Sequence, residues 1–213
     1  MKLQLCLLTF FLHTMPVMSQ VIPDQSTLMA RAPAVFQAVF NTSKGDFTVE
    51  VIREWSPAGA DRLYQLLATG FYDQNSIFRV QKNYVVQFGI CDKKEVNAFW
   101  DKRPIPDEDI MASNLKGTIS YARDGVNSRT TQLFINLKDN LKLDTVNFNG
   151  LRGFPPVAKI INGFDAVESF YGSYGFEPAN HQDSLMVCGN RYLNKKFPML
   201  DSIINTQIII IKD

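Results

Sequence analysis

The chain has 213 residues, 46% of them hydrophobic and 12% aromatic, which suits one globular domain with additional terminal segments. The formal net charge is only +1 and no run of like charge exceeds a few residues, so neither a nucleic-acid-binding surface nor an acidic tail is indicated. With His13 in the N-terminal segment, only His181 remains. This excludes a zinc cluster and the Ser-His-Asp and Cys-His catalytic sets, and we expect no metal or other cofactor.

The first twenty residues have the layout of a secretory signal peptide. Lys2 precedes an apolar stretch from Leu3 to Leu12, and small and polar residues follow around Ser19. The stretch is too short to span a bilayer comfortably, and a buried N-terminal helix is the alternative. We therefore expect an exported protein without a membrane span. It would be periplasmic if the source is bacterial, and in the secretory pathway or extracellular if the source is eukaryotic.

Two cysteines remain once Cys6 is assigned to the signal peptide. Cys91 and Cys188 form a disulfide in an oxidising compartment, or they are two separate small buried thiols. A single pair gives no spacing pattern that decides between these alternatives.

The mature chain begins with a Pro-interrupted, mixed segment over residues 21–34, which predicts a flexible lead-in. A β-hairpin follows, because the apolar runs 35–40 and 47–51 flank the turn residues 43–46.

The clearest helix starts with Ser56 as N-cap and Pro57 at the first helical position, and it stops at Gly70. A second short helix is expected at about 165–171, and Trp100 should anchor the Pro-stiffened loop 100–109 to the body. Short strands separated by turn-rich loops indicate an antiparallel sheet or barrel. These strands are expected at about 77–80, 84–89, 117–122, 132–136, 156–161 and 184–188.

The stretch from Ser76 to Gly89 contains two short apolar runs, each with one polar residue that does not suit a barrel wall, Arg79 and Gln87. An isolated arginine on a strand is usually a solvated side chain, and an isolated glutamine is usually ordinary surface polarity. The neighbouring motifs change this interpretation.

The order of the motifs is more specific than any one of them. They are Phe78-Arg79 with Tyr84-Val85, Gln87 and Gly89, then Lys116–Ala122, then Thr131–Asn136, then Leu143-Asp144. In this order they resemble the cyclophilins, the peptidyl-prolyl cis-trans isomerases, from about Val35 to Gly189. The tracts ASNLKGTISYAR and TTQLFINLKDN are most similar to the exported bacterial branch of that family. The resemblance implies a mainly β fold, an eight-stranded antiparallel β-barrel capped by two α-helices.

The resemblance also implies a set of site residues on the outer surface of the barrel. Arg79 takes the place of the catalytic arginine, and Gln87 takes the place of the glutamine that binds the substrate backbone. The proline pocket and the groove for an extended peptide would be built by Tyr84, Val85, Phe134, Leu143, Ala122, Arg123 and Gln132.

The sequence departs from the family pattern at the pocket. Tyr84 and Val85 replace a phenylalanine and a methionine, and Lys142 replaces a tryptophan at the pocket mouth. The histidine expected after Leu143-Asp144 is missing, an insertion occupies 145–152, and Phe154 is expected to fill the place of that histidine.

These observations predict a signal peptide over 1–20, the lead-in over 21–34, an isomerase domain over 35–190 and a C-terminal extension over 191–213. The apolar tail from Gln207 should pair with a sheet edge or cover the body. The expected function is isomerisation of X-Pro bonds in unfolded or extended exported polypeptides, assisting their folding, by a monomer. The alternatives are a cyclophilin-like binding module or chaperone with weak or no isomerase activity and, more weakly supported, a structural role in an envelope assembly.

Overall fold

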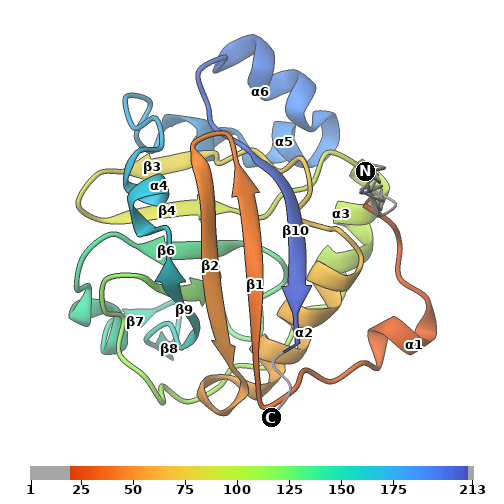
Figure 1. The fold of residues 1–213 in the computed structure, drawn as a ribbon, viewed down its shortest axis with the longest axis vertical. Coiled ribbons are helices and arrows are strands. Elements are labelled where there is room, and N and C mark those ends of the chain that lie inside the picture. Colours follow the sequence, from red (N-terminus) through yellow and green to blue (C-terminus); the bar gives the residue numbers. More distant parts are fainter. Residues whose placement is uncertain (1–19, 211–213) are drawn as a thin grey trace, which may run out of the picture.

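The computed structural model describes residues 20–210, and its centre is an antiparallel sheet that curls on itself (Figure 1). Its eight strands lie in the order β10-β1-β2-β9-β5-β6-β4-β3, which confirms the expected mainly β, eight-stranded antiparallel architecture. The strands are β1 (Val35–Thr42), β2 (Gly45–Ile52), β3 (Arg79–Gln81), β4 (Val85–Phe88), β5 (Thr118–Tyr121), β6 (Leu133–Asn136), β9 (Pro156–Asn162) and β10 (Ile203–Ile209). The predicted signal peptide lies, apart from Gln20, outside the described residues.

The two outer strands of the sheet are β3 and β10, and backbone hydrogen bonds join the chain at the start of each. The backbone N–H of Ile77 donates to the carbonyl of Asp201 at 2.9 Å, and that of Ile203 donates to Asn75 at 2.8 Å. These bonds bring the first and last strands of the sheet together, so that both edges are partly covered.

Helices surround the sheet, and two of them lie where the sequence predicts them, α2 (Pro57–Ala68) and α4 (Phe164–Glu168). No helix between residues 20 and 210 is both long enough and apolar enough to cross a membrane. The remaining helical elements are α1 (Gln25–Leu28), α3 (Lys94–Asp101), α5 (Gln182–Cys188), α6 (Asn190–Lys196), and the 3₁₀ turns η1 (Arg53–Trp55), η2 (Leu141–Asp144) and η3 (Glu177–His181).

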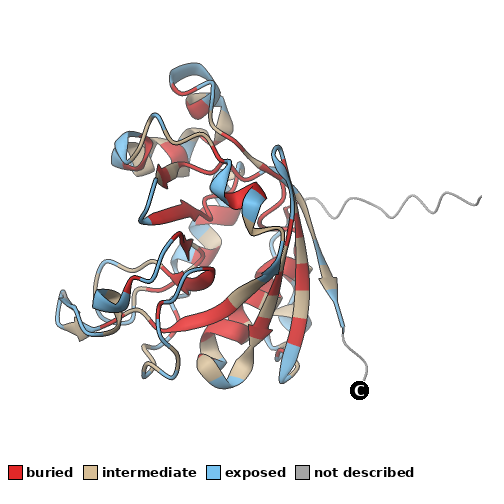
Figure 2. Ribbon diagram, turned by 60° about the vertical axis from the view of Figure 1, so that its left-hand side comes forward, coloured by how far each residue is buried: buried red, intermediate tan, exposed pale blue. Residues whose placement is uncertain are grey.

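The main core fills the concave side of the curled sheet. Along β1, every second residue is buried, among them Phe36, Ala38 and Phe40, because successive side chains of a strand point to opposite faces. Phe40 stacks on Phe47 of β2 with ring centroids 4.9 Å apart. Figure 2 shows the same alternation of buried and half-buried residues along these long strands. The side chains between the buried ones point to the outer face of the sheet and are not part of this core.

A second apolar cluster holds α5 and α6 near β3, at the upper end of the view in Figure 1. It consists of Phe78, Ile90, Ala179, Leu185, Leu193 and Phe197. The prediction of a strand over 184–188 is therefore wrong, because Leu185 buries its side chain in this cluster from a helix. The last strand is β10, and it pairs along β1 from Gln37 to Thr42. The expected pairing of the C-terminal tail with a sheet edge is confirmed as far as Ile209.

A carboxylate from a distant loop caps helix α2. Glu108 accepts hydrogen bonds from the backbone N–H groups of Ala58 at 2.6 Å and Gly59 at 3.3 Å, and the hydroxyl of Ser56 donates to the same carboxylate. Ser56 is the N-cap residue, as predicted, but its side chain makes no capping hydrogen bond to the helix, and Glu108 supplies the acceptor instead. An ionised carboxylate is a stronger acceptor than a hydroxyl and also complements the positive end of the helix dipole.

Two further segments are more ordered than the sequence suggests. The lead-in runs along α2, where the amide of Gln65 donates to the carbonyls of Leu28 and Ala30 at 2.9 and 3.0 Å. Trp100 is fully buried, as expected of an anchor, but it lies on α3 and not in a loop. Val96 and Trp100 are four residues apart and both face the core, a helical spacing that the surrounding polar residues conceal.

The insertion over 145–152 forms a small hairpin of β7 (Asn147–Phe148) and β8 (Leu151–Arg152). Its two turn residues, Asn149 and Gly150, have φ angles of 48° and 86°, the left-handed conformation that tight hairpins require. The insertion is therefore a compact structure beside η2.

Both cysteines of the described chain are free thiols. Cys91 is buried, and burial raises its pKa to about 12, whereas Cys188 is half-buried. Because burial raises its pKa, the Cys91 thiol is almost entirely protonated near pH 8.

We expect iodoacetamide near pH 8 to label Cys188 in the folded protein and to spare Cys91, since the thiolate is the nucleophile. Peptide mass mapping after a short exposure measures both sites, and labelling in denaturant should reach both. Equal labelling of the two sites in the folded protein would contradict the burial of Cys91.

Candidate active site

Arg79 and Gln87 lie directly opposite each other on the β3–β4 hairpin. The Nη1 of Arg79 donates to the Oε1 of Gln87 at 2.8 Å, and its Nε donates to the Oε1 of Gln81 at 2.8 Å. The turn between the strands includes Asn83 with a φ of 58°, which lets the chain reverse tightly. The two polar residues in the apolar runs are thus paired with each other on the outer face of the sheet.

The hydrogen-bond chain continues away from Arg79 through three glutamines. The Nε2 of Gln87 donates to the Oε1 of Gln132 at 2.9 Å. The Nε2 of Gln132 then donates to the Oε1 of Gln182 at 2.8 Å. The guanidinium has only donors, so it fixes the direction in which each amide of the chain points.

An apolar cavity of about 430 Å³ lies beside this chain on the outer face. Val85 and Phe134 form its floor, and although both are buried, neither side chain belongs to the main core. The ring of Phe154 meets that of Phe134 edge to face, with centroids 5.7 Å apart. Of the ten residues predicted for the site, nine line this cavity: Arg79, Gln87, Tyr84, Val85, Ala122, Arg123, Phe134, Leu143 and Phe154.

The tenth predicted residue, Gln132, lines a neighbouring cavity of about 360 Å³. This second cavity is more polar and includes Asp124, Asn127 and Ser128. Gln87 borders both cavities, so the glutamine chain runs between them. Together the two cavities form one extended groove over the outer face of β4 and β6.

Arg123 stands at the boundary between the two cavities. Its Nη2 donates to the carbonyls of Leu151, at 3.2 Å, and Gly153, and its Cζ lies 4.8 Å from the ring centroid of Phe154. Burial lowers its pKa. Arg123 therefore ties the 145–152 insertion to the groove.

Burial also lowers the pKa of Arg79, and the nearby Tyr84 opposes this shift. The guanidinium remains charged at physiological pH, because arginine is not deprotonated in proteins. A half-buried cation makes stronger hydrogen bonds than a fully solvated one, since less water competes for its donors.

Several residues of the groove are not predicted from the sequence, among them Phe176 and Gln182. Phe176 lines the apolar cavity, and the Cζ of Arg79 lies 4.7 Å from the centroid of its ring. Gln182 borders both cavities and ends the glutamine chain. No local pattern marks either residue, because both reach the site only through the packing of η3 and α5 against β3 and α3.

The part of the chain that contains the groove is similar to known proteins. The family model "cyclophilin type peptidyl-prolyl cis-trans isomerase/CLD" matches residues 37–183. The chain belongs to this family. Peptidyl-prolyl cis-trans isomerase CYP18-1 of Arabidopsis thaliana is 29% identical over 134 residues, covering 60% of this chain and 78% of its own length. Peptidyl-prolyl cis-trans isomerase A of Dickeya dadantii is 29% identical over 136 residues, covering 61% of this chain and 68% of its own.

A solved structure shares the cyclophilin fold. The cyclophilin-type isomerase of Cryptosporidium parvum superposes with a TM-score of 0.59 at 18% identity, over 84% of this chain and 99% of that protein. The matched family region ends at residue 183, so it includes all ten predicted site residues as well as Phe176 and Gln182. Helix α6 and strand β10 lie beyond it.

Proposed function

We propose that this cyclophilin-type protein is an active prolyl isomerase that acts on X-Pro bonds in unfolded or extended polypeptides. One observation carries the proposal. The charged, half-buried Arg79 lies at the wall of an apolar cavity that is also lined by the buried side chains of Val85 and Phe134. An apolar cavity of this kind accepts a prolyl ring, and the arginine lies beside it.

The chemistry needs no bond to break. Rotation about an X-Pro bond has a barrier of ~18–20 kcal/mol, because resonance gives the C–N bond partial double-bond character. A catalyst lowers it by favouring the twisted amide, whose nitrogen regains a lone pair that can accept a hydrogen bond. Arg79 is suited to donate this bond at any physiological pH.

Arg79 retains donors for this purpose. A guanidinium has five N–H groups. Arg79 donates within the protein to the side-chain oxygens of Gln81 and Gln87. These bonds leave one hydrogen on Nη1 and one on Nη2 with no acceptor among the described residues. They also hold the plane of the guanidinium, so that little reorientation is needed in the transition state.

Gln87 supports the other half of the recognition. Its Nε2 carries two hydrogens, and Gln132 accepts one of them. The second can bind a carbonyl of the flanking peptide. The half-buried Ala122 lines both cavities without a bulky side chain, which leaves room for an extended chain along the groove.

The test is isomerisation of a panel of X-Pro peptides, measured by exchange between the cis and trans forms, together with refolding of a protein whose slow phase is a prolyl isomerisation. We expect faster exchange and faster refolding in the presence of catalytic amounts of the protein. Binding of the peptides without faster exchange would instead support the alternative, a binding module or chaperone.

We further propose that the protein is exported and acts on exported clients, as in the bacterial branch that its motifs resemble. The support is the sequence of residues 1–20, with Lys2 before the apolar stretch Leu3–Leu12. Intact mass of the protein recovered from its own cells should show the loss of a segment of about this length. A full-length protein retained in the cytoplasm would contradict export.

A further inference from the structure

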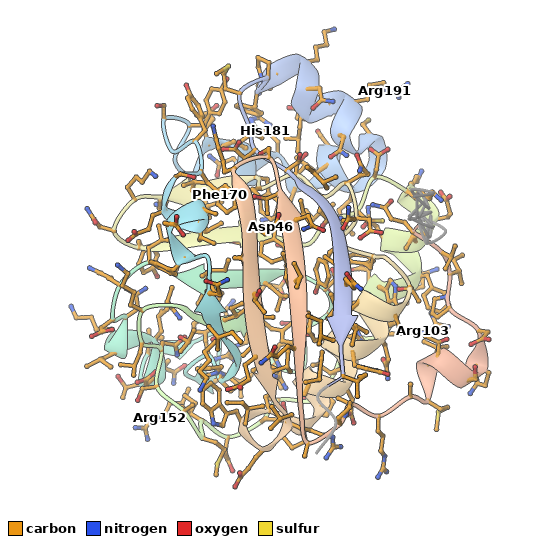
Figure 3. The ribbon with its side chains drawn as sticks, in the orientation of Figure 1. Asp46, Arg103, Arg152, Phe170, His181 and Arg191 are labelled. Carbon is orange, nitrogen blue, oxygen red and sulfur yellow. The ribbon has the colours of Figure 1, made fainter. Side chains whose placement is uncertain are left out.

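A short segment outside the curled sheet supplies one wall of the groove. We call it the 176–182 segment, and it comprises Phe176, η3 and the first residue of α5. Figure 3 shows His181, the last residue of η3, at the end of the molecule that carries α5 and α6. Its two end residues, Phe176 and Gln182, both line the apolar cavity.

The segment is firmly held against β3. The backbone N–H of Val80, in the middle of β3, donates to the carbonyl of Gly175 at 3.2 Å. Ala179 is buried in the second apolar cluster, and the ring of Tyr174 meets that of Phe197 with centroids 5.2 Å apart. The segment is therefore fixed well enough to position side chains of the site.

Gln182 accepts the last hydrogen bond of the chain that begins at Arg79. The guanidinium requires the Oε1 of Gln87 to face it, which directs the Nε2 of Gln87 to Gln132 and the Nε2 of Gln132 to position 182. An acceptor at 182 therefore stabilises the amide orientations of the two glutamines before it. A donor at 182 would oppose them.

Phe176 acts on the arginine itself. The Cζ of Arg79 lies 4.7 Å from the ring centroid of Phe176 and 5.7 Å from that of Tyr84, so the guanidinium lies near two aromatic rings. A cation held against a ring face is favoured electrostatically. Gln81 and Gln87 fix the guanidinium of Arg79 through hydrogen bonds, and Phe176 further restricts its orientation.

We propose that the 176–182 segment completes the active site, with Gln182 and Phe176 as positioning residues for Gln87 and Arg79. This inference rests on the proposed isomerase function. The role assigned to the segment is to orient Arg79 and Gln87, which lie on the curled sheet.

The first test replaces Gln182 with glutamate, methionine and lysine. Glutamate keeps an acceptor, methionine keeps the length without a hydrogen bond, and lysine offers only donors. We expect kcat/KM to stay within about twofold for Gln182→Glu, to fall about three- to tenfold for Gln182→Met, and to fall further for Gln182→Lys. A role in packing alone would give methionine and lysine similar values and no advantage to glutamate.

The matched control is Gln207→Met, the same substitution at an exposed glutamine on β10, which should leave kcat/KM unchanged. A second check is the double variant Gln132→Ala with Gln182→Met. If Gln182 acts through Gln132, the second substitution should add almost nothing to the loss caused by the first. Full additivity of the two losses would overturn this route.

The second test compares Phe176→Tyr with Phe176→Leu. Tyrosine keeps the ring, whereas leucine keeps an apolar side chain without a π face, so kcat should fall about three- to tenfold only for leucine, with KM within about twofold of the parent. The matched control is Phe164→Leu, because Phe164 lies under Lys116 at the same 4.7 Å but outside the groove. That substitution should leave kcat unchanged.

These outcomes separate the two proposals. A parent protein that does not accelerate X-Pro exchange would overturn the proposed function, and with it this inference. An active parent whose Gln182 and Phe176 variants all keep kcat and KM within about twofold would overturn the inference alone. Melting curves of each variant distinguish the effects on catalysis from loss of folded protein, and activity losses that only follow the folded fraction would also overturn it.

Discussion

Replacement of Arg79 by alanine should lower the isomerisation rate by roughly 10- to 150-fold and leave the fold intact. A charge-assisted hydrogen bond contributes ~1.5–3 kcal/mol, and about 1.4 kcal/mol corresponds to a tenfold change in rate. The bond to the prolyl nitrogen forms only as the amide twists, so the loss belongs to the transition state. Affinity for an X-Pro peptide should therefore stay within a few-fold of the parent.

Arg79→Lys should restore little of the rate. An ammonium on a flexible stem cannot donate at once to Gln81, to Gln87 and to the substrate in the fixed plane of the guanidinium. Exchange rates and peptide titrations on both variants give the two quantities needed. The matched control is Arg191→Ala, since Arg191 is an exposed arginine on α6 (Figure 3). A well-folded Arg79→Ala protein with full activity would show that this arginine is only a surface residue.

Replacement of Glu108 by alanine should destabilise the protein by about 3–5 kcal/mol, because it leaves a buried cation without its partner. Arg129 is 1% exposed, and its Nη2 lies 2.9 Å from the Oε2 of Glu108. The same substitution removes the acceptor that caps the first turn of α2 at Ala58 and Gly59. One carboxylate thus serves both an ion pair and a helix terminus.

For a domain of this size, such a loss lowers the melting temperature by roughly 6–20 °C. Glu108→Gln keeps an oxygen for the helix and should cost less than alanine. The control is Glu168→Gln, because the Lys116–Glu168 pair joins two half-exposed side chains at 2.7 Å and a surface pair contributes about 0–1 kcal/mol. Thermal or urea unfolding measures all three variants. Equal, small shifts for Glu108→Ala and Glu168→Gln would refute the role of the buried pair.

Local sequence patterns predict much of the fold. The β1–β2 hairpin and helix α2 follow from apolar periodicity and turn residues that act over a few positions. The patterns fail where polar residues dilute the periodicity, as on α3, or where an apolar run is short, as at 184–188. In those places tertiary packing decides whether a segment becomes a helix, a strand or a loop.

The candidate site also has a part that sequence motifs predict and a part that only the tertiary structure shows. Nine of the ten predicted residues line one cavity. Arg79, Gln87 and Phe134 do so because they hold outward positions on strands whose register the sheet fixes, and the others lie on the same strands, on η2 or in the adjoining loops.

Neighbours from outside those motifs appear only with the tertiary structure. Glu108 reaches the end of α2, and Phe176 and Gln182 reach Arg79 and Gln132, across long separations in the chain. The sequence alone therefore determined the curled sheet and the outward positions of Arg79 and Gln87. Only the tertiary structure, through the packing of α5 and α6 in the second apolar cluster, placed Phe176 and Gln182 beside Arg79 and the glutamine chain. The physical reason is that contacts between distant segments depend on how whole elements pack and not on any local pattern.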